Sequence, residues 1–259
     1  MTVSRTAPAF AGRVPLPVWV GIAAAWTVAI AAEATGTSGA VHHDKLLEGG
    51  PGIGLALLAF VPAWGVMIAA MMLPSSLPLV RMYAAASVAA PDRSRSMAAF
   101  LAGYGLVWSA FGVLAFLFDA GVHASVNAWG WLDTNQWLIA PSTVMLAGAF
   151  QFTPLKDACL RACRHPASFL QRHYGRGPRA GLNLGLRHAV FCVGCCWALM
   201  LLMFAVGAGN LVWMAALTAL MVHEKTQPSG GRTVPVTGAV LLGMGSTLLL
   251  YAAYANGAI

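Results

Sequence analysis

Residues 185–203 read GLRHAVFCVGCCWALMLLM, a stretch that is apolar enough for a membrane and holds three of the five cysteines in the chain. Cys192, Cys195 and Cys196 follow His188 at intervals of four, seven and eight residues. These intervals place side chains on one face of an α-helix. The stretch therefore predicts a membrane helix that carries a stripe of thiols and one imidazole.

The rest of the chain has the composition of a multi-pass membrane protein. Of its 259 residues, 59% are hydrophobic and 9% are charged, whereas about 25% of a soluble domain is charged. Apolar runs of about 20 residues recur along the chain, and the alternating pattern of β-barrel strands is missing. Because helices satisfy their own backbone hydrogen bonds in lipid, we predict an all-α membrane bundle.

Seven apolar segments predict transmembrane helices after an N-terminal cytoplasmic tail at 1–16. No clear cleavage site follows this tail, so we expect the first segment to be retained as a helix. The whole chain, 1–259, is then a single transmembrane domain. The segments occupy residues 17–33, 54–73, 98–118, 136–152, 187–206, 210–223 and 234–254.

The basic residues predict how these helices are oriented. With the N-terminus in the cytoplasm, fourteen of the fifteen Lys and Arg residues fall in cytoplasmic segments, and only Lys45 falls outside. Lys and Arg accumulate on the cytoplasmic side of membrane proteins. We therefore predict an N-in, C-out topology. The net charge of +7 is expected to meet anionic lipid headgroups, and nucleic acid is not expected as a partner.

A short amphipathic helix is predicted at 154–165, on the cytoplasmic side of the fourth segment. Thr153 suits the N-cap and Pro154 the first helical position. Cys159 and Cys163 are four residues apart, so their thiols point the same way. Nearby Arg and Lys side chains are expected to favour the thiolate forms.

Other candidate side chains of the site fall at the same predicted level. Met71 and Met72 precede Pro74, where we expect the second helix to break or kink, and Glu224 follows the sixth segment. A fifth helix that starts near residue 187 places its cysteines close to the cytoplasmic surface. Because the cytosol is reducing, we expect free thiols there.

Together these side chains predict a site for a soft metal ion, copper(I) first and zinc(II) second, since thiolates and thioethers prefer such ions. Three cysteines are the expected primary ligands, two more capture or pass on the ion, and the others assist, except that Glu224 is expected to tune the charge or to pair with Lys225. In that order they are Cys192, Cys195 and Cys196; Cys159 and Cys163; and Met71, Met72, His188 and Glu224. No catalytic residue is predicted, so an enzyme is the less favoured class.

The same residues leave two alternatives open. Cysteine packs well between helices, so a structural or accessory membrane subunit without metal is one of them. Cys192 and Cys195 also form a C-x2-C pair, which indicates a thiol–disulfide redox protein, although no βαβ pattern accompanies it. Carboxylates are missing from the centres of the predicted spans, which favours metal binding or delivery over pumping.

Four sequence blocks resemble a bacterial family of multi-pass inner-membrane proteins that are described as metal-binding, some of them as copper chaperones. The resemblance covers about residues 55–250 and implies an inner-membrane location and a metal-related role. A protein that donates or accepts the metal is then an expected partner beside the lipid bilayer. The blocks are AMMLPS at 70–75 with Pro78, QFTPLK at 151–156 with Cys159 and Cys163, residues 185–200 with CVGCCW at 192–197, and Glu224-Lys225.

Overall fold

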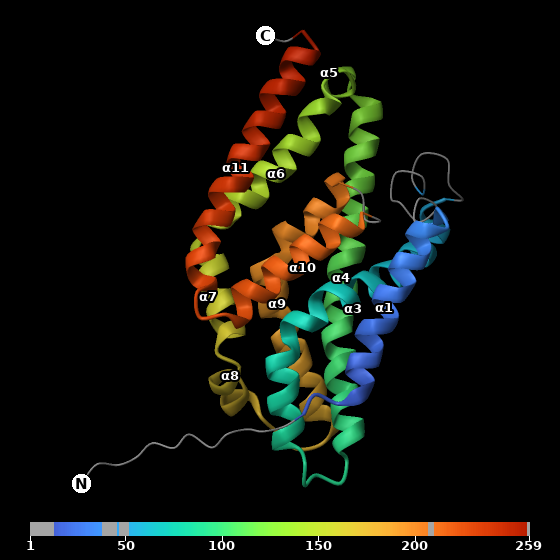
Figure 1. The fold of residues 1–259 in the computed structure, drawn as a ribbon. Coiled ribbons are helices and arrows are strands. Elements are labelled where there is room, and N and C mark those ends of the chain that lie inside the picture. The colour runs from blue at the N-terminus through green and yellow to red at the C-terminus, as the bar shows by residue number, and fades with distance from the viewer. Residues whose placement is uncertain (1–12, 38–45, 47–51, 207–209, 258–259) are drawn as a thin grey trace, which may run out of the picture.

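The computed structural model describes residues 13–37, 46, 52–206 and 210–257, and every regular element within them is a helix (Figure 1). The all-α class is therefore confirmed, while most of the predicted N-terminal tail lies outside the described residues. The longer helices are α1 (Leu16–Ala34), α3 (Ile53–Ala86), α4 (Arg93–Ala128), α6 (Ile139–Phe150), α9 (Pro178–Val206), α10 (Leu211–Thr226) and α11 (Gly230–Ala255). The shorter ones are α5 (Gly130–Thr134), η2 (Gln136–Leu138), α7 (Pro154–Arg164) and α8 (Pro166–His173).

Five helices in the described part of the chain are long and apolar enough to cross a membrane, namely α1, α3, α4, α9 and α11. A sixth crossing results if α6 with η2 and the following α7, bent by 64°, are counted as one broken span. Helix α10 has 16 residues, fewer than the roughly 20 that a crossing needs. Length and composition thus support five or six spans, where the sequence predicted seven.

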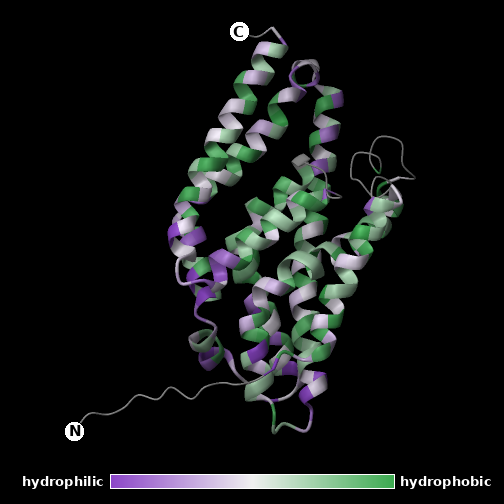
Figure 2. Ribbon diagram, viewed as in Figure 1, coloured by the Kyte–Doolittle hydropathy of each residue, from purple (hydrophilic) through white to green (hydrophobic). Residues whose placement is uncertain are grey.

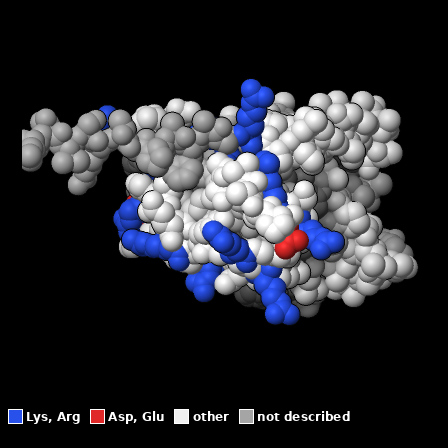
Figure 3. All heavy atoms as spheres, turned by 90° about the horizontal axis from the view of Figure 1, so that it is seen from below, with Lys and Arg blue, Asp and Glu red and all other residues white. Residues whose placement is uncertain are grey.

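The two ends of the bundle differ in polarity. The first residues of α1 and the last residues of α11 lie at opposite ends, as an N-in, C-out topology requires (Figure 1). Hydrophilic residues gather at the lower end and around α7 (Figure 2). Seen from below, that end carries many Lys and Arg side chains and little Asp or Glu (Figure 3). This is the distribution that the positive-inside rule associates with a cytoplasmic side.

Helix α3 continues through Pro74 and Pro78 to Ala86, although the sequence predicted that this span ends near residue 73. Proline removes the hydrogen bond to the carbonyl four residues earlier. For Pro74 this is the carbonyl of Ala70, and the indole Nε1 of Trp26 on α1 donates to it at 3.1 Å. A neighbouring helix therefore replaces the lost bond, and α3 bends without ending (Figure 1).

Helix α9 begins at Pro178, nine residues before its predicted start. Two glycines in this extension face α4: a Cβ on Gly181 would collide with the carbonyl oxygen of Ser96, and one on Gly185 with that of Phe100. These glycines let two helix backbones approach closely, which is a common use of small residues in membrane helices. The α9 cysteines consequently lie about 21–27 Å along the helix, near its middle and not near its start.

Replacing Gly185 with alanine is expected to lower the free energy of unfolding by about 1–3 kcal/mol, because the new Cβ forces α9 away from Phe100 of α4. Gly105→Ala is the matched control, since Gly105 lies inside α4 and a Cβ added there would meet no neighbouring group within 4 Å. Thermal denaturation in detergent compares the two. Equal shifts in the melting midpoint would show that the close approach is not what Gly185 provides.

Candidate metal centre

The cysteines of α7 and α9 meet in the interior of the bundle. Helix α7 begins as predicted, with the Thr153 side chain accepting the backbone N–H three residues on at 3.2 Å. Cys163 Sγ lies 3.9 Å from Cys195 Sγ, and Cys195 Sγ lies 3.4 Å from Cys196 Sγ. All five cysteines are buried free thiols. The structure therefore brings together two groups of sulfurs that are far apart in the sequence.

Gly194 creates the space for Cys159 beside α9. A Cβ at Gly194 would lie 2.6 Å from Cys159 Sγ, closer than two such atoms can come. Burial raises the pKa of the Cys159 thiol. The expectation that neighbouring Arg and Lys side chains favour its thiolate is therefore wrong, because α7 turns this cysteine inward. A metal ion that binds here must displace the proton.

A buried ammonium group lies against the sulfur of Cys192. Lys225 Nζ donates to Cys192 Sγ at 3.1 Å and to Ser75 Oγ at 3.0 Å. The hydroxyl of Tyr104 lies 3.1 Å from the same sulfur. Lys225 is 5% exposed, so it does not reach water as long cationic side chains at helix ends often do. The side chain thus joins α3, α9 and α10 at one point.

His188 belongs to the same polar network but lies on its far side. Ser76 Oγ donates to the Tyr104 hydroxyl at 3.2 Å, and His188 Nε2 lies 3.1 Å from Ser76 Oγ. The imidazole stacks on the rings of Phe100 and Tyr104, with centroids 6.3 and 5.7 Å away. The structure therefore places His188 at Ser76, and its predicted role as an assisting metal ligand stays a prediction.

Glu224 forms an ion pair that ties α7 to the end of α10. Lys156 Nζ lies 2.7 Å from Glu224 Oε2, and the two side chains are 0% and 1% exposed. The second oxygen, Oε1, is buried and has no hydrogen-bond partner within the described part of the chain. Arg164 of α7 also donates to the backbone carbonyl of Glu224 at 2.6 Å. These contacts fix the helix that carries Cys159 and Cys163.

Met71 and Met72 line the same region from α3. Both are fully buried and belong to the core cluster that contains all five cysteines. The Met72 carbonyl accepts hydrogen bonds from Ser75 Oγ at 2.8 Å and from the Tyr104 hydroxyl at 3.3 Å. The turn around Pro74 is thus held by side chains of the polar network.

Sequence reasoning did not place Tyr104 or Lys156 in the site, and it considered Lys225 as a partner of Glu224, whereas Glu224 pairs with Lys156 and Lys225 contacts Cys192. Ser75 and Ser76 inside an apolar segment were a usable signal, because polar side chains within membrane helices usually have partners. Lys225 was visible as a charge next to a membrane segment, but its sequence context did not distinguish a buried ammonium from an exposed one. Tyr104 carried no signal beyond that of an interior aromatic residue.

The sulfur positions resemble those around a bound metal but do not complete a site. Two thiolates that hold one ion at 2.3 Å in a tetrahedral site are about 3.8 Å apart, and the observed separations of 3.9 and 3.4 Å fall on either side. Across the described ranges, no group of three or more His, Cys, Asp or Glu is arranged to hold a metal ion.

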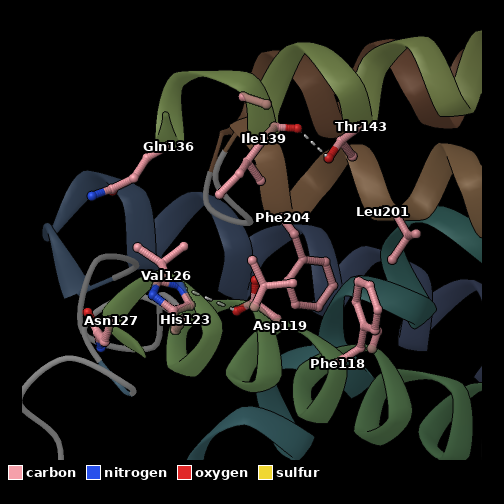
Figure 4. Close-up of a pocket in the computed structure, with 13 residues that line it drawn as sticks. Phe118, Asp119, His123, Val126, Asn127, Gln136, Ile139, Thr143, Leu201 and Phe204 are labelled. Carbon is pink, nitrogen blue, oxygen red and sulfur yellow. Dashed lines mark hydrogen bonds and ion pairs between the residues drawn. The ribbon is translucent and has the colours of Figure 1, made fainter. Parts of the chain in front are cut away.

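A separate cavity of about 340 Å³ lies between the later parts of α4 and α9, with η2 and α6 on its other side (Figure 4). Asp119 and His123 give it a polar wall, with Oδ2 and Nε2 3.8 Å apart. The described residues that line it include no cysteine or methionine. Leu201 lines it from α9 and is nine residues after Cys192, on the opposite face of the helix. The cavity is therefore distinct from the cysteine cluster.

The chain matches a family of known proteins. The family model PpoB2, described as copper chaperone, matches residues 61–248. This range contains the cysteine cluster, the polar network around Lys225 and the Lys156–Glu224 pair. No curated protein and no solved structure matches the chain.

Proposed function

The chain belongs to the PpoB2 family of copper chaperones, and from this premise we propose that it binds Cu(I) at the cysteine cluster and passes the ion to a partner protein. The observation that carries the proposal is the contact between Cys163 of α7 and Cys195 of α9, which are 32 residues apart in the chain. Thiolates select soft ions such as Cu(I) and Zn(II) over the hard cations of the cell.

In this proposal the cysteines have different tasks. Cys192, Cys195 and Cys196 hold the ion, because they are at most 1% exposed. Cys159 and Cys163 are each 9% exposed and lie nearer the surface on α7, so they capture the ion or pass it on. Neighbouring thiolates exchange an ion without releasing it to water. Met71, Met72 and His188 support the site from its border.

The charge of Lys225 supports copper over zinc. Each thiolate contributes one negative charge, and an uncompensated charge is costly in a buried site. In this proposal two of the three α9 cysteines are thiolates and the third stays a thiol, so two thiolates, one Cu(I) and the Lys225 ammonium sum to zero. With Zn(II) the same set carries one positive charge. A buried ammonium next to Cys192 therefore suits a monovalent ion.

The proposed setting is the inner membrane of a bacterial cell, with the basic end of the bundle in the cytoplasm (Figure 3). Glu224 supports the site indirectly, since its ion pair with Lys156 holds α7 against α10. The partner that donates or accepts the ion is expected to approach from the side of α7, where Cys159 and Cys163 are closest to solvent.

Element analysis of the purified protein tests this proposal. After loading with Cu(I) under anaerobic, reducing conditions, the wild type is expected to retain about one copper per chain through its thiolates. Cys195→Ser is expected to retain almost none, because this sulfur contacts both Cys163 and Cys196. Cys159→Ser is the matched comparison and is expected to lose less, since its sulfur lies against Gly194. Equal copper contents in wild type and Cys195→Ser would refute the proposal.

A further inference from the structure

We propose that the bundle conducts Cu(I) between the cysteine cluster and the opposite side of the membrane along a column of methionine thioethers. The inference rests on the proposed copper function and extends it from holding the ion to moving it across the bilayer. Three helices that meet at the cluster supply the column. Its members are Met71 and Met67 on α3, Met200 and Met203 on α9, and Met221 and Met214 on α10.

Half of the methionines in the chain lie in this column, since it holds six of twelve. Each of the six is at most 5% exposed, and all belong to the core cluster that contains the five cysteines. The second core cluster contains Met97 as its one buried methionine among the described residues. Leucine fills a similar volume, so packing alone does not require thioethers to gather in one of the two clusters.

Lys225 fixes the register of the three helices at the lower end of the column. Its Nζ contacts Ser75 of α3 and Cys192 of α9 while belonging to α10 itself. Helices α3 and α10 run opposite to α9 (Figure 1). Moving one turn away from Lys225 therefore means four residues back on α3 and α10 and four forward on α9. The residues reached are Met71, Met221 and Cys196, so each helix places a sulfur at this level.

A further contact supports the register of α3 and α9 at the upper end. The rings of Trp64 on α3 and Phe204 on α9 lie 5.9 Å apart between centroids. Eleven residues separate Ser75 from Trp64 and Cys192 from Met203, which is about 16 Å on each helix. Met203 precedes Phe204 directly. Met214 lies in the first turn of α10, where its backbone N–H donates to the Asn210 carbonyl. Since α10 begins at Leu211, shortly after α9 ends at Val206, Met214 lies at the same end of the bundle as Met203.

The chemistry of the column suits passage of the ion. Thioethers bind Cu(I) but carry no charge, so they hold the ion less firmly than thiolates do. Conduction requires several binding sites whose affinity is high enough for the ion to enter and low enough for the ion to leave. The ion stays Cu(I) throughout and only exchanges sulfur ligands, so no oxidant or reductant is consumed. The missing carboxylates, which counted against transport at the level of sequence, are not needed by a soft ion.

Copper flux into liposomes tests the column. The protein is reconstituted into vesicles that enclose a coloured Cu(I)-selective chelator, and a Cu(I)–thiol complex is added outside. The double variant Met203→Leu/Met214→Leu removes the two thioethers of the column that are farthest from the cysteines. It is expected to lower the initial rate of colour formation by about tenfold or more, because each lost ligand raises the barrier along the path. The amount of copper bound per chain is expected to stay at the wild-type value.

Met97→Leu is the matched control, since Met97 is 8% exposed and lies in the other core cluster. It is expected to conduct like the wild type. Unchanged copper binding shows that a variant is folded. If the double variant does not fold, Met203→Leu and Met214→Leu are measured separately in its place. Wild-type flux in Met203→Leu/Met214→Leu would overturn the column. A wild type that binds copper but conducts no faster than empty vesicles would also overturn it, while the copper-binding proposal would stand. A wild type that binds no copper would overturn both.

Discussion

Lys156→Met is expected to lower the free energy of unfolding by about 3–5 kcal/mol, because it leaves the carboxylate of Glu224 charged and buried without its partner. The two side chains are 0% and 1% exposed and lie 2.7 Å apart. Glu224 Oε1 already lacks a hydrogen-bond partner within the described part of the chain. The loss is measured by denaturation in detergent micelles, followed by circular dichroism.

Two comparisons separate the charge from the packing of the side chain. The double variant Lys156→Met/Glu224→Gln removes both charges and is expected to recover most of the loss, since buried pairs gain little over neutral replacements. Asp157→Asn breaks the exposed ion pair with Arg161 on the same helix and is expected to cost at most about 1 kcal/mol. If the double variant is as unstable as Lys156→Met, the buried charge is not the cause.

Lys225→Met is expected to shift the metal preference of the site from Cu(I) toward Zn(II) by about a hundredfold. The ammonium lies 3.1 Å from Cys192 Sγ. Two unit charges about 4 Å apart interact by about 4 kcal/mol at an effective dielectric constant of 20, and about 2.7 kcal/mol is a hundredfold in affinity. Without the ammonium, a divalent ion balances two thiolates by itself, whereas Cu(I) leaves one negative charge.

Competition with chelators selective for Cu(I) and for Zn(II) measures this shift on the purified protein. Lys225→Arg keeps the positive charge and is expected to keep the preference of the wild type. An equal fall of both affinities in Lys225→Met would show that Lys225 only shapes the site. A preference unchanged from the wild type would show that its charge does not act on the bound ion.

The helices themselves could be predicted because their signals are local. Apolar runs of the right length give α1, α4 and α11, and Thr153 followed by Pro154 gives the start of α7. Two helices, α3 and α9, extend beyond their predicted spans, and the groups that they contact there lie elsewhere in the chain. Trp26 completes the backbone of α3 at Ala70. The carbonyl of Phe100 lies so close to Gly185 that α9 is already packed against α4 before residue 187.

By itself, the sequence determined which cysteines share a helix face, because spacings of three and four residues have a set meaning on a helix. Only the tertiary structure decided that Cys163 meets Cys195. It also decided the roles of two adjacent residues, since Glu224 pairs with Lys156 while Lys225 contacts Cys192. Neighbours on a helix point about 100° apart. What each one meets depends on the helices packed on that side, and no local pattern in the chain contains that information.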